Sequence, residues 1–131
     1  MAVGLLDTSV IVDWDNPEVV AALPDEVAVS AITMAELATG PHLATDLSER
    51  ARRQARLQEA EALFEPLAFD HAAARSYGQV VAAVTAYGRS HRRRVADFLS
   101  AAAAQAAGLT LYTRNPDDFV GLGTLIAVVT V

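Results

Sequence analysis

Apolar runs and amphipathic stretches alternate along the chain, and this pattern predicts a parallel α/β fold. Short apolar runs are typical of buried strands, and they predict strands at residues 2–6, 27–30, 65–69, 109–113 and 126–131. Longer stretches with an apolar face predict helices at 10–14, 18–23, 33–40, 48–64, 70–87 and 94–107, and a helix start at 115–119. Strands that alternate with helices form parallel sheets. We therefore expect one α/β domain, residues 1–131, with a five-stranded parallel sheet flanked by helices.

Local signals predict where several helices begin and end. Thr8 or Ser9 is a suitable N-cap for the first helix, and Asp70 is one for the helix at 70–87. Thr33 and Glu36 have the spacing of a capping box. Glycine or proline predicts the helix ends at Gly40-Pro41, Gly88 and Gly108.

The composition limits the class of protein. The chain has 131 residues, 53% of them hydrophobic, so it can bury a core and disorder is not expected. The absence of cysteine excludes disulfides, thiolate zinc sites and a cysteine nucleophile, and it suits a reducing cytosol. The start does not resemble a signal peptide, and no apolar run approaches the ~20 residues that span a bilayer. We expect a cytoplasmic protein without membrane contact.

The charge distribution is acidic overall but basic in one place. The net charge is −6, and all ten basic residues are arginine, which excludes a lysine Schiff base and a P-loop lysine. Four of these arginines fall between Arg89 and Arg94. We expect Arg92 and Arg93 to contact phosphate groups, whereas Arg94, at a helix start, has a structural role or a pairing with an acid as its alternatives. The alternative for this stretch is a solvated loop.

Four acids lie where a strand or loop gives way to a helix, namely Asp7, Glu36, Asp97 and Asp118. In an open α/β sheet these junctions share one edge, outside the carboxyl ends of the strands. Carboxylates gathered there repel one another unless a cation lies among them. Hard divalent cations choose carboxylate oxygens. The pattern therefore predicts a Mg²⁺ or Mn²⁺ site and a phosphodiester-cleaving enzyme.

Each acid also has a purely structural interpretation. Asp7 could cap the helix that follows it, and Glu36 could close its capping box, which would leave it less free to face a metal. Asp97 fits a structural role least well, because its helix is apolar on most faces and a buried carboxylate needs a partner or a metal. Asp117 and Asp118 are adjacent first-turn acids, and only one of them can face the cluster.

Four segments resemble the four motifs of PIN-domain ribonucleases, and they occur in the same order. They are Leu5-Leu6-Asp7-Thr8-Ser9, Ser30-Ala31-Ile32-Thr33-Met34-Ala35-Glu36-Leu37, Val95-Ala96-Asp97-Phe98-Leu99-Ser100-Ala101-Ala102 and Thr113-Arg114-Asn115-Pro116-Asp117-Asp118-Phe119. The length and layout resemble the VapC toxins of VapBC toxin–antitoxin pairs. The resemblance implies a five-stranded parallel sheet, a Mg²⁺- or Mn²⁺-dependent endoribonuclease acting on tRNA or ribosomal RNA, a VapB antitoxin as partner, and a homodimer.

Carried over by motif, Asp7 and Asp97 resemble the principal metal ligands of that family, and Glu36 and Asp118 resemble its third and fourth acids. Supporting polar residues of the site are matched by Thr8, Ser9 and Asn115. In some toxins of this kind an acid stands where this chain has Asn115.

Two other classes of protein are disfavoured by residues that this chain lacks, and one alternative remains. A phosphotransfer receiver domain requires a lysine, and a haloacid-dehalogenase phosphatase requires Asp-x-Asp where this chain has Asp7-Thr8-Ser9. A catalytically inactive PIN-like module that only binds RNA or protein is the remaining alternative, although all four acids are present.

Overall fold

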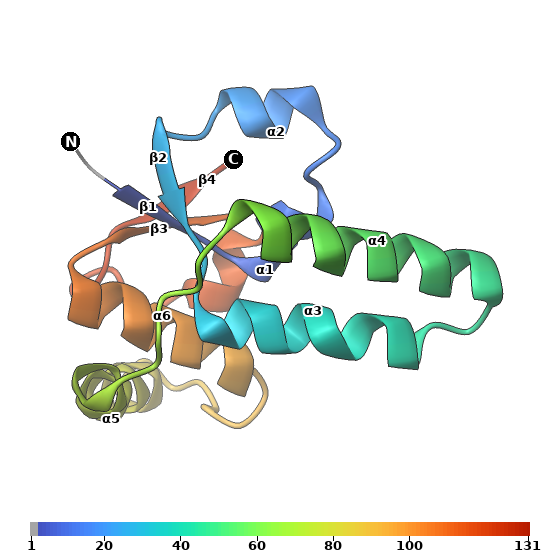
Figure 1. The fold of residues 1–131 in the computed structure, drawn as a ribbon. Helices are drawn as coiled ribbons and strands as arrows, with labels where there is room; N and C mark the ends of the chain where they lie inside the picture. The colour runs from blue at the N-terminus through green and yellow to red at the C-terminus, as the bar shows by residue number, and fades with distance from the viewer. Residues whose placement is uncertain (1–2) are drawn as a thin grey trace.

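A computed structural model describes residues 3–131 and has a parallel sheet between helices (Figure 1). The strands are β1 (Val3–Leu6), β2 (Glu26–Ala28), β3 (Thr110–Thr113) and β4 (Val128–Thr130). The helices are α1 (Thr8–Val12), α2 (Pro17–Ala21), α3 (Ala31–Leu43), α4 (Leu47–Leu63), α5 (His71–Ala86) and α6 (Val95–Ala107), followed by the 3-10 helix η1 (Pro116–Phe119). The strand order is β2-β1-β3-β4, and all pairs are parallel. The predicted parallel α/β architecture is confirmed.

The sheet within residues 3–131 has four strands and not five, so the strand expected at 65–69, the third along the chain, is wrong. That segment pairs only as an isolated bridge, in which the Leu67 amide donates to Val29 and the Leu67 carbonyl accepts from Ala31, each at 2.8 Å. Pro66 precedes Leu67 and has no N–H to donate to a ladder. The segment therefore touches the edge of the sheet at one residue only. Ala2, the first residue of the first predicted strand, lies outside the described residues.

Two hydrophobic clusters lie on opposite faces of the sheet. Leu5 and Leu6 are neighbours in β1, and because side chains alternate along a strand, they point into different clusters. Helices α5 and α6 pack on the Leu5 face, around Phe98 and the alanines of α6. Helices α1 to α4 supply the Leu6 cluster, which includes Val10 and Ile11. The core thus fixes α1 and α6, the two helices that begin beside Asp7 and Asp97.

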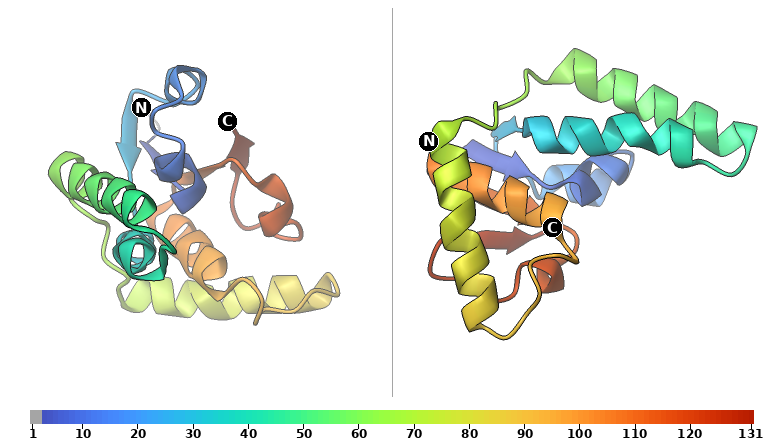
Figure 2. Two further views of the ribbon diagram at one scale, coloured as in Figure 1. Left: turned by 90° about the vertical axis from the view of Figure 1, so that its right-hand side faces the viewer. Right: turned by 90° about the horizontal axis from the view of Figure 1, so that it is seen from below.

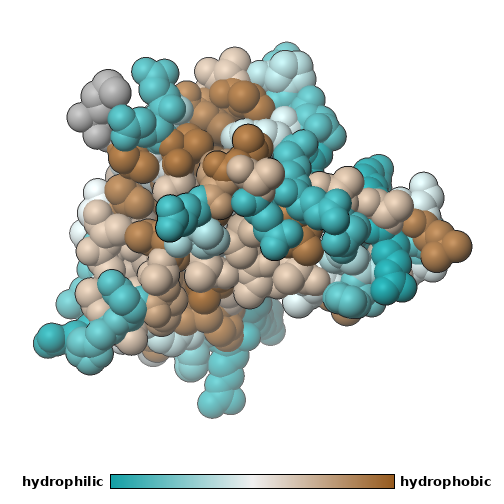
Figure 3. All heavy atoms as spheres, viewed as in Figure 1, coloured by the Kyte–Doolittle hydropathy of each residue, from teal (hydrophilic) through white to brown (hydrophobic). Residues whose placement is uncertain are grey.

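Helices α3 and α4 form a hairpin that projects beyond the rest of the molecule (Figures 1 and 2). Hydrophobic surface appears at the end of this hairpin (Figure 3), where α3 ends at the exposed Leu43 and α4 begins at the exposed Leu47. Helix α3 runs through to Leu43 with Pro41 inside it, so the expected end at Gly40-Pro41 is wrong. Pro41 lies in the last turn of α3, so the backbone hydrogen bond that proline cannot donate is lost where the helix is about to end.

Two further predicted helix-end signals are confirmed, and two predicted N-terminal signals are wrong. The Asp70 side chain caps α5 by accepting from the Ala73 amide at 2.9 Å, and Gly108 ends α6 with φ 69°. Helix α1, however, begins at Thr8 with Asp7 in the N-cap position, so neither Thr8 nor Ser9 is its N-cap. The capping box is also wrong, because Ser30 caps α3 and accepts from the Thr33 amide at 3.1 Å.

Candidate active site

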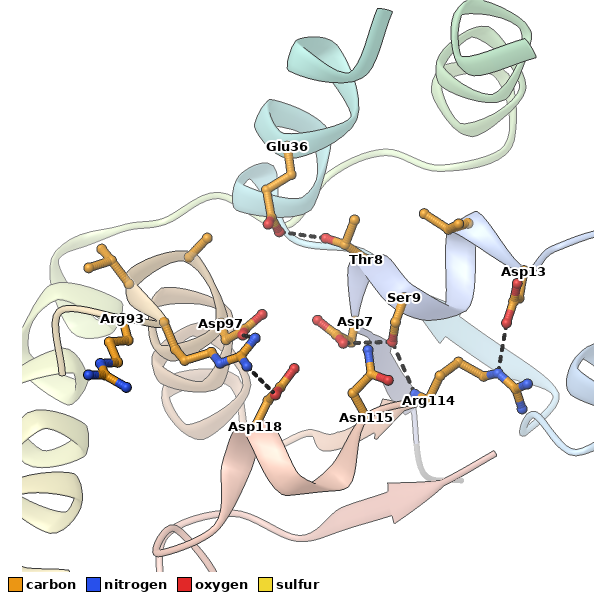
Figure 4. A pocket seen from close by; sticks show the side chains of 14 residues that line it. Asp7, Thr8, Ser9, Asp13, Glu36, Arg93, Asp97, Arg114, Asn115 and Asp118 are labelled. Atoms are coloured by element: carbon orange, nitrogen blue, oxygen red, sulfur yellow. Dashed lines mark hydrogen bonds and ion pairs between the residues drawn. The ribbon is translucent and has the colours of Figure 1, made fainter. Parts of the chain in front are cut away.

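All four predicted acids line one open pocket of about 580 Å³ at the carboxyl edge of the sheet (Figure 4). Asp7 follows β1, Glu36 lies in the second turn of α3, Asp97 in the first turn of α6, and Asp118 in η1. The fold therefore brings together side chains from four elements that are far apart in sequence. The pocket is also lined by the predicted supporting residues and by arginines, namely Thr8, Ser9, Asn115, Arg93, Arg94 and Arg114.

Asp7 is held by hydroxyl groups rather than by charged partners. Its side chain is only 3% exposed. Its Oδ2 accepts from Ser9 Oγ at 2.7 Å (Figure 4). The same oxygen accepts from Thr113 Oγ1 at 2.9 Å. The same hydroxyls accept from the amides of Arg114 and Asn115, at 3.0 and 2.9 Å. This network ties the β1–α1 junction to the end of β3, so the Asp7 carboxylate stands in one fixed orientation.

Thr113 belongs to this network but was not predicted as a site residue. Its position at the end of a predicted strand and at the start of the fourth motif was the signal available in the sequence. Asn115 stands at the N-cap position of η1, but its side chain makes no capping hydrogen bond there. Its side chain lines the pocket instead.

Glu36 faces the pocket because a different residue caps its helix. With Ser30 as N-cap, Glu36 falls in the second turn of α3, beyond reach of its own helix start. Its Oε1 accepts from Thr8 Oγ1 at 2.6 Å. Burial raises the pKa of the Glu36 carboxyl, the Thr8 hydrogen bond lowers it, and the negative charge of Asp7 raises it. Thr8 is therefore the residue that orients Glu36.

Asp97 shows how strongly the acids influence one another. The pKa of its carboxyl is raised to about 7, first by burial and then by the negative charges of Asp7, Asp118 and Glu36, while Arg94 lowers it. The direction is that expected for a carboxyl group desolvated among like charges. The pocket therefore contains more negative charge than it can stabilise with its own partners.

The adjacent acids of the fourth motif differ in their surroundings. The Asp118 side chain is 15% exposed and lines the pocket, whereas Asp117 is exposed on the surface. The Asp117 carbonyl accepts from Arg89 at 3.0 Å. Of the two, the structure places Asp118 with the other acids.

The four arginines between Arg89 and Arg94 lie in four different environments. Arg89 donates to the carbonyls of Asp117 and Val120, at 3.0 and 3.1 Å, and so holds η1 in place. Arg94 pairs with Asp118 and Asp97. Arg93 lines the pocket, while Arg92 is exposed in the turn before α6 and is not among the lining residues.

Arg114 was missed by the sequence reasoning. Its Nε donates to Asp13 at 2.9 Å and its Nη1 to the Val131 carbonyl at 2.6 Å. The guanidinium thus joins the β3–η1 junction to α1 at the side of the pocket. Its position inside the fourth motif, beside Asn115, was the only signal for it.

The donor chemistry of the pocket fits a hard divalent cation. Carboxylate and hydroxyl oxygens surround it, which are the ligands that Mg²⁺ and Mn²⁺ prefer. Within residues 3–131, however, no three histidine, aspartate or glutamate side chains are grouped closely enough to hold an ion as they stand. The residue types fit the metal, and the carboxylates would have to approach one another to bind it.

The PIN domain family model matches residues 4–123 of the chain. The chain belongs to the PIN-domain family. This PIN domain is 37% identical over 123 residues to Ribonuclease VapC5 of Mycobacterium tuberculosis. The matched region covers 92% of the chain and 88% of that protein. The domain is 34% identical over 105 residues to Ribonuclease VapC8 of the same species, covering 80% of the chain and 93% of that protein.

Solved structures agree with the sequence comparison. The PIN domain superposes on the crystal structure of the toxin–antitoxin family member VapBC-5 from Mycobacterium tuberculosis with a TM-score of 0.84 and 34% identity, covering 100% of this chain and 98% of that one. FitAcB from Neisseria gonorrhoeae gives a TM-score of 0.76 and 32% identity over 95% of each chain. The suspected family is confirmed. Among residues 3–131 of this PIN domain, none of the helices has the length and apolarity needed to cross a bilayer.

Proposed function

We propose that this PIN domain is a Mg²⁺- or Mn²⁺-dependent endoribonuclease and the toxin of a type II toxin–antitoxin pair. The observation that carries the proposal is the gathering of four mutually repelling carboxylates in one pocket. The ionised form of Asp97 is so disfavoured there that the pKa of this residue is about 7. Relatives named Ribonuclease VapC5 and Ribonuclease VapC8 support the same activity.

Asp7 and Asp97 would hold the metal ion, and Glu36 and Asp118 would complete the acidic site. When bound, such an ion activates water and neutralises charge on the phosphate under attack. The protein's part is to hold the carboxylates in position, through Ser9 for Asp7 and Thr8 for Glu36. The chemistry therefore needs no nucleophilic side chain.

The proposed partner is a VapB-type antitoxin, supported by the similarity to VapBC-5, which is described as a member of a toxin–antitoxin family. A second groove, of about 880 Å³, continues between α3 and α4 and shares four lining residues with the active pocket, namely Thr8, Val12, Asp13 and Glu36. An antitoxin segment in this groove would reach the acids directly. We also propose a homodimer and a cytoplasmic location, the latter because a chain without cysteine has no disulfide that would need an oxidising compartment.

Incubation of the purified protein with structured RNA tests the activity. We expect cleavage with Mn²⁺ or Mg²⁺ and none with EDTA, because the carboxylates alone cannot neutralise the phosphate. RNA binding without cleavage at any metal concentration would instead favour an inactive PIN-like module.

Arg92 and Arg93 are the proposed RNA-binding residues. An acidic protein repels RNA, so binding should depend on local arginines beside Asp97. We expect the double substitution Arg92→Ala, Arg93→Ala to weaken RNA binding and to flatten its salt dependence by about one unit of slope for each lost phosphate contact. Binding titrations at several salt concentrations measure both.

The matched control is the double substitution Arg50→Ala, Arg75→Ala. It removes the same charge from two exposed positions on α4 and α5 that do not line the active pocket. Equal losses in the two double variants would mean that RNA responds only to net charge, and that Arg92 and Arg93 form no specific contact.

A further inference from the structure

Arg94 is positioned between two of the acids. Its Nη2 lies 3.2 Å from Asp118 Oδ1, and its Nη1 lies 3.9 Å from Asp97 Oδ2. Within residues 3–131, it is the only basic side chain in a salt bridge with either carboxylate. In the metal-free protein, part of the negative charge of the pocket is therefore balanced by this one guanidinium.

Helix formation does not account for an arginine at this position. Arg94 is the N-cap of α6, where Ser, Thr, Asp or Asn would satisfy a free amide, and its side chain makes no capping hydrogen bond. The positive end of the helix dipole also disfavours a cation there. The two carboxylates supply the attraction that offsets this cost.

The two sides of the pocket differ in how their acids are held. Asp7 accepts hydrogen bonds from the neutral hydroxyls of Ser9 and Thr113, which leave its negative charge in place. Asp118, in contrast, uses Oδ1 in an ion pair with Arg94. The Asp7 carboxylate is therefore free of any cationic partner when a metal ion arrives, whereas the Asp118 carboxylate is already paired with a guanidinium.

We infer that Arg94 is a resident counter-cation of the acidic pocket, and that a divalent metal ion must displace its guanidinium from Asp97 and Asp118 in order to bind. The inference rests on the metal site in the proposed function and names the residue that sets its affinity. The Arg94 side chain is 47% exposed, so it can turn into solvent without disturbing the core. Once it has moved, Asp97 and Asp118 can approach the ion.

Titration of the metal-free protein with MnCl₂, without RNA, tests the inference by calorimetry. We expect Arg94→Gln to bind Mn²⁺ about three- to tenfold more tightly than the wild type, the range that one or two half-exposed ion pairs can supply. We expect the same variant to unfold at a lower temperature in EDTA, because the acids lose their counter-charge. A purely structural role for Arg94 would weaken Mn²⁺ binding instead.

Arg93→Gln is the matched control, because it removes the same charge from the wall of the same pocket. Within residues 3–131, no salt bridge to Arg93 is found, so this variant should bind Mn²⁺ within about twofold of the wild type. Arg94→Lys keeps the charge and should also stay close to the wild type, even if Arg94→Gln folds poorly. A tighter Arg94→Lys would overturn the inference, as would an equal gain in Arg93→Gln.

The outcomes separate this inference from the proposed function. If the wild type binds Mn²⁺ and Arg94→Gln binds it no more tightly, Arg94 is not a competitor, and the metal site stands. If neither the wild type nor Arg94→Gln binds Mn²⁺, both the metal site and the inference fail. Binding that appears only in Arg94→Gln would support the inference most strongly.

Discussion

The substitution Asp97→Asn is expected to lower the rate of RNA cleavage by about 10²- to 10³-fold or more, the loss typical when a group that stabilises transition-state charge is removed. Asp97 lies in the first turn of α6 and faces the other acids across the pocket. An amide oxygen is a poorer ligand for a hard cation than a carboxylate. Initial rates at a fixed Mn²⁺ concentration, with the RNA in excess, measure the effect.

The fold should survive this substitution. Asn removes one of the mutually repelling charges that raise the pKa of Asp97, so the metal-free variant should be at least as stable as the wild type at pH 8. Asp117→Asn is the matched control, since Asp117 is exposed and does not line the pocket. We expect wild-type cleavage from Asp117→Asn. Wild-type cleavage from Asp97→Asn would refute the proposed metal site.

The second large effect is a loss of folding stability as the pH rises, which a bound metal ion offsets. In EDTA, the folded protein should lose stability as the pH rises from about 4 to about 7. The pKa of Asp97 is about 7 in the folded state against an ordinary value of 3.8, so in this window the folded state binds the proton that the unfolded chain has released. The loss is at most about 1.4 kcal/mol per pH unit for one proton. The raised pKa of Glu36 acts in the same direction.

Mn²⁺ should offset this loss at pH 8, because it binds the folded carboxylates and not the unfolded chain. At a concentration 100 times the dissociation constant, the gain is about 2.7 kcal/mol. At pH 5.5 the gain should be smaller, because protons compete with the ion for Asp97. Thermal unfolding at both pH values, with EDTA and with MnCl₂, measures the shifts. An equal Mn²⁺ shift at both pH values would show that the ion binds elsewhere.

Local signals in the sequence determined the fold class and the positions of the acids. The alternation of apolar runs with amphipathic stretches depends on neighbouring residues, and it predicted the parallel sheet. Once strands are parallel, their carboxyl ends meet at one edge, so Asp7 and Asp97 could be placed together before any contact was known. Asp70 and Gly108 were assigned correctly for the same reason, since a cap involves only the adjacent turn.

Where two nearby residues were equally suitable as a helix cap, only the tertiary structure decided between them. Ser30 and Thr33 could each cap α3, and Ser30 does so because its backbone pairs with Leu67 at the end of the strand region. That choice leaves Glu36 facing Thr8 rather than its own helix start. The strand predicted at residues 65–69 was wrong for a similar reason. The length of a strand depends on the neighbouring strand with which it pairs as well as on its own apolar character.

Side-chain partners that are distant in sequence were also beyond prediction. Arg89 and Arg94 belong to one basic stretch, yet one holds the carbonyls of η1 and the other pairs with Asp118. Thr113 and Arg114 joined the site through bonds to Asp7 and Asp13, more than one hundred residues away. The sequence by itself determined the fold class and which acids share the edge of the sheet, because these depend on short-range periodicity. Only the tertiary structure decided which cation faces them, because an ion pair forms where the packed chain brings two charges together.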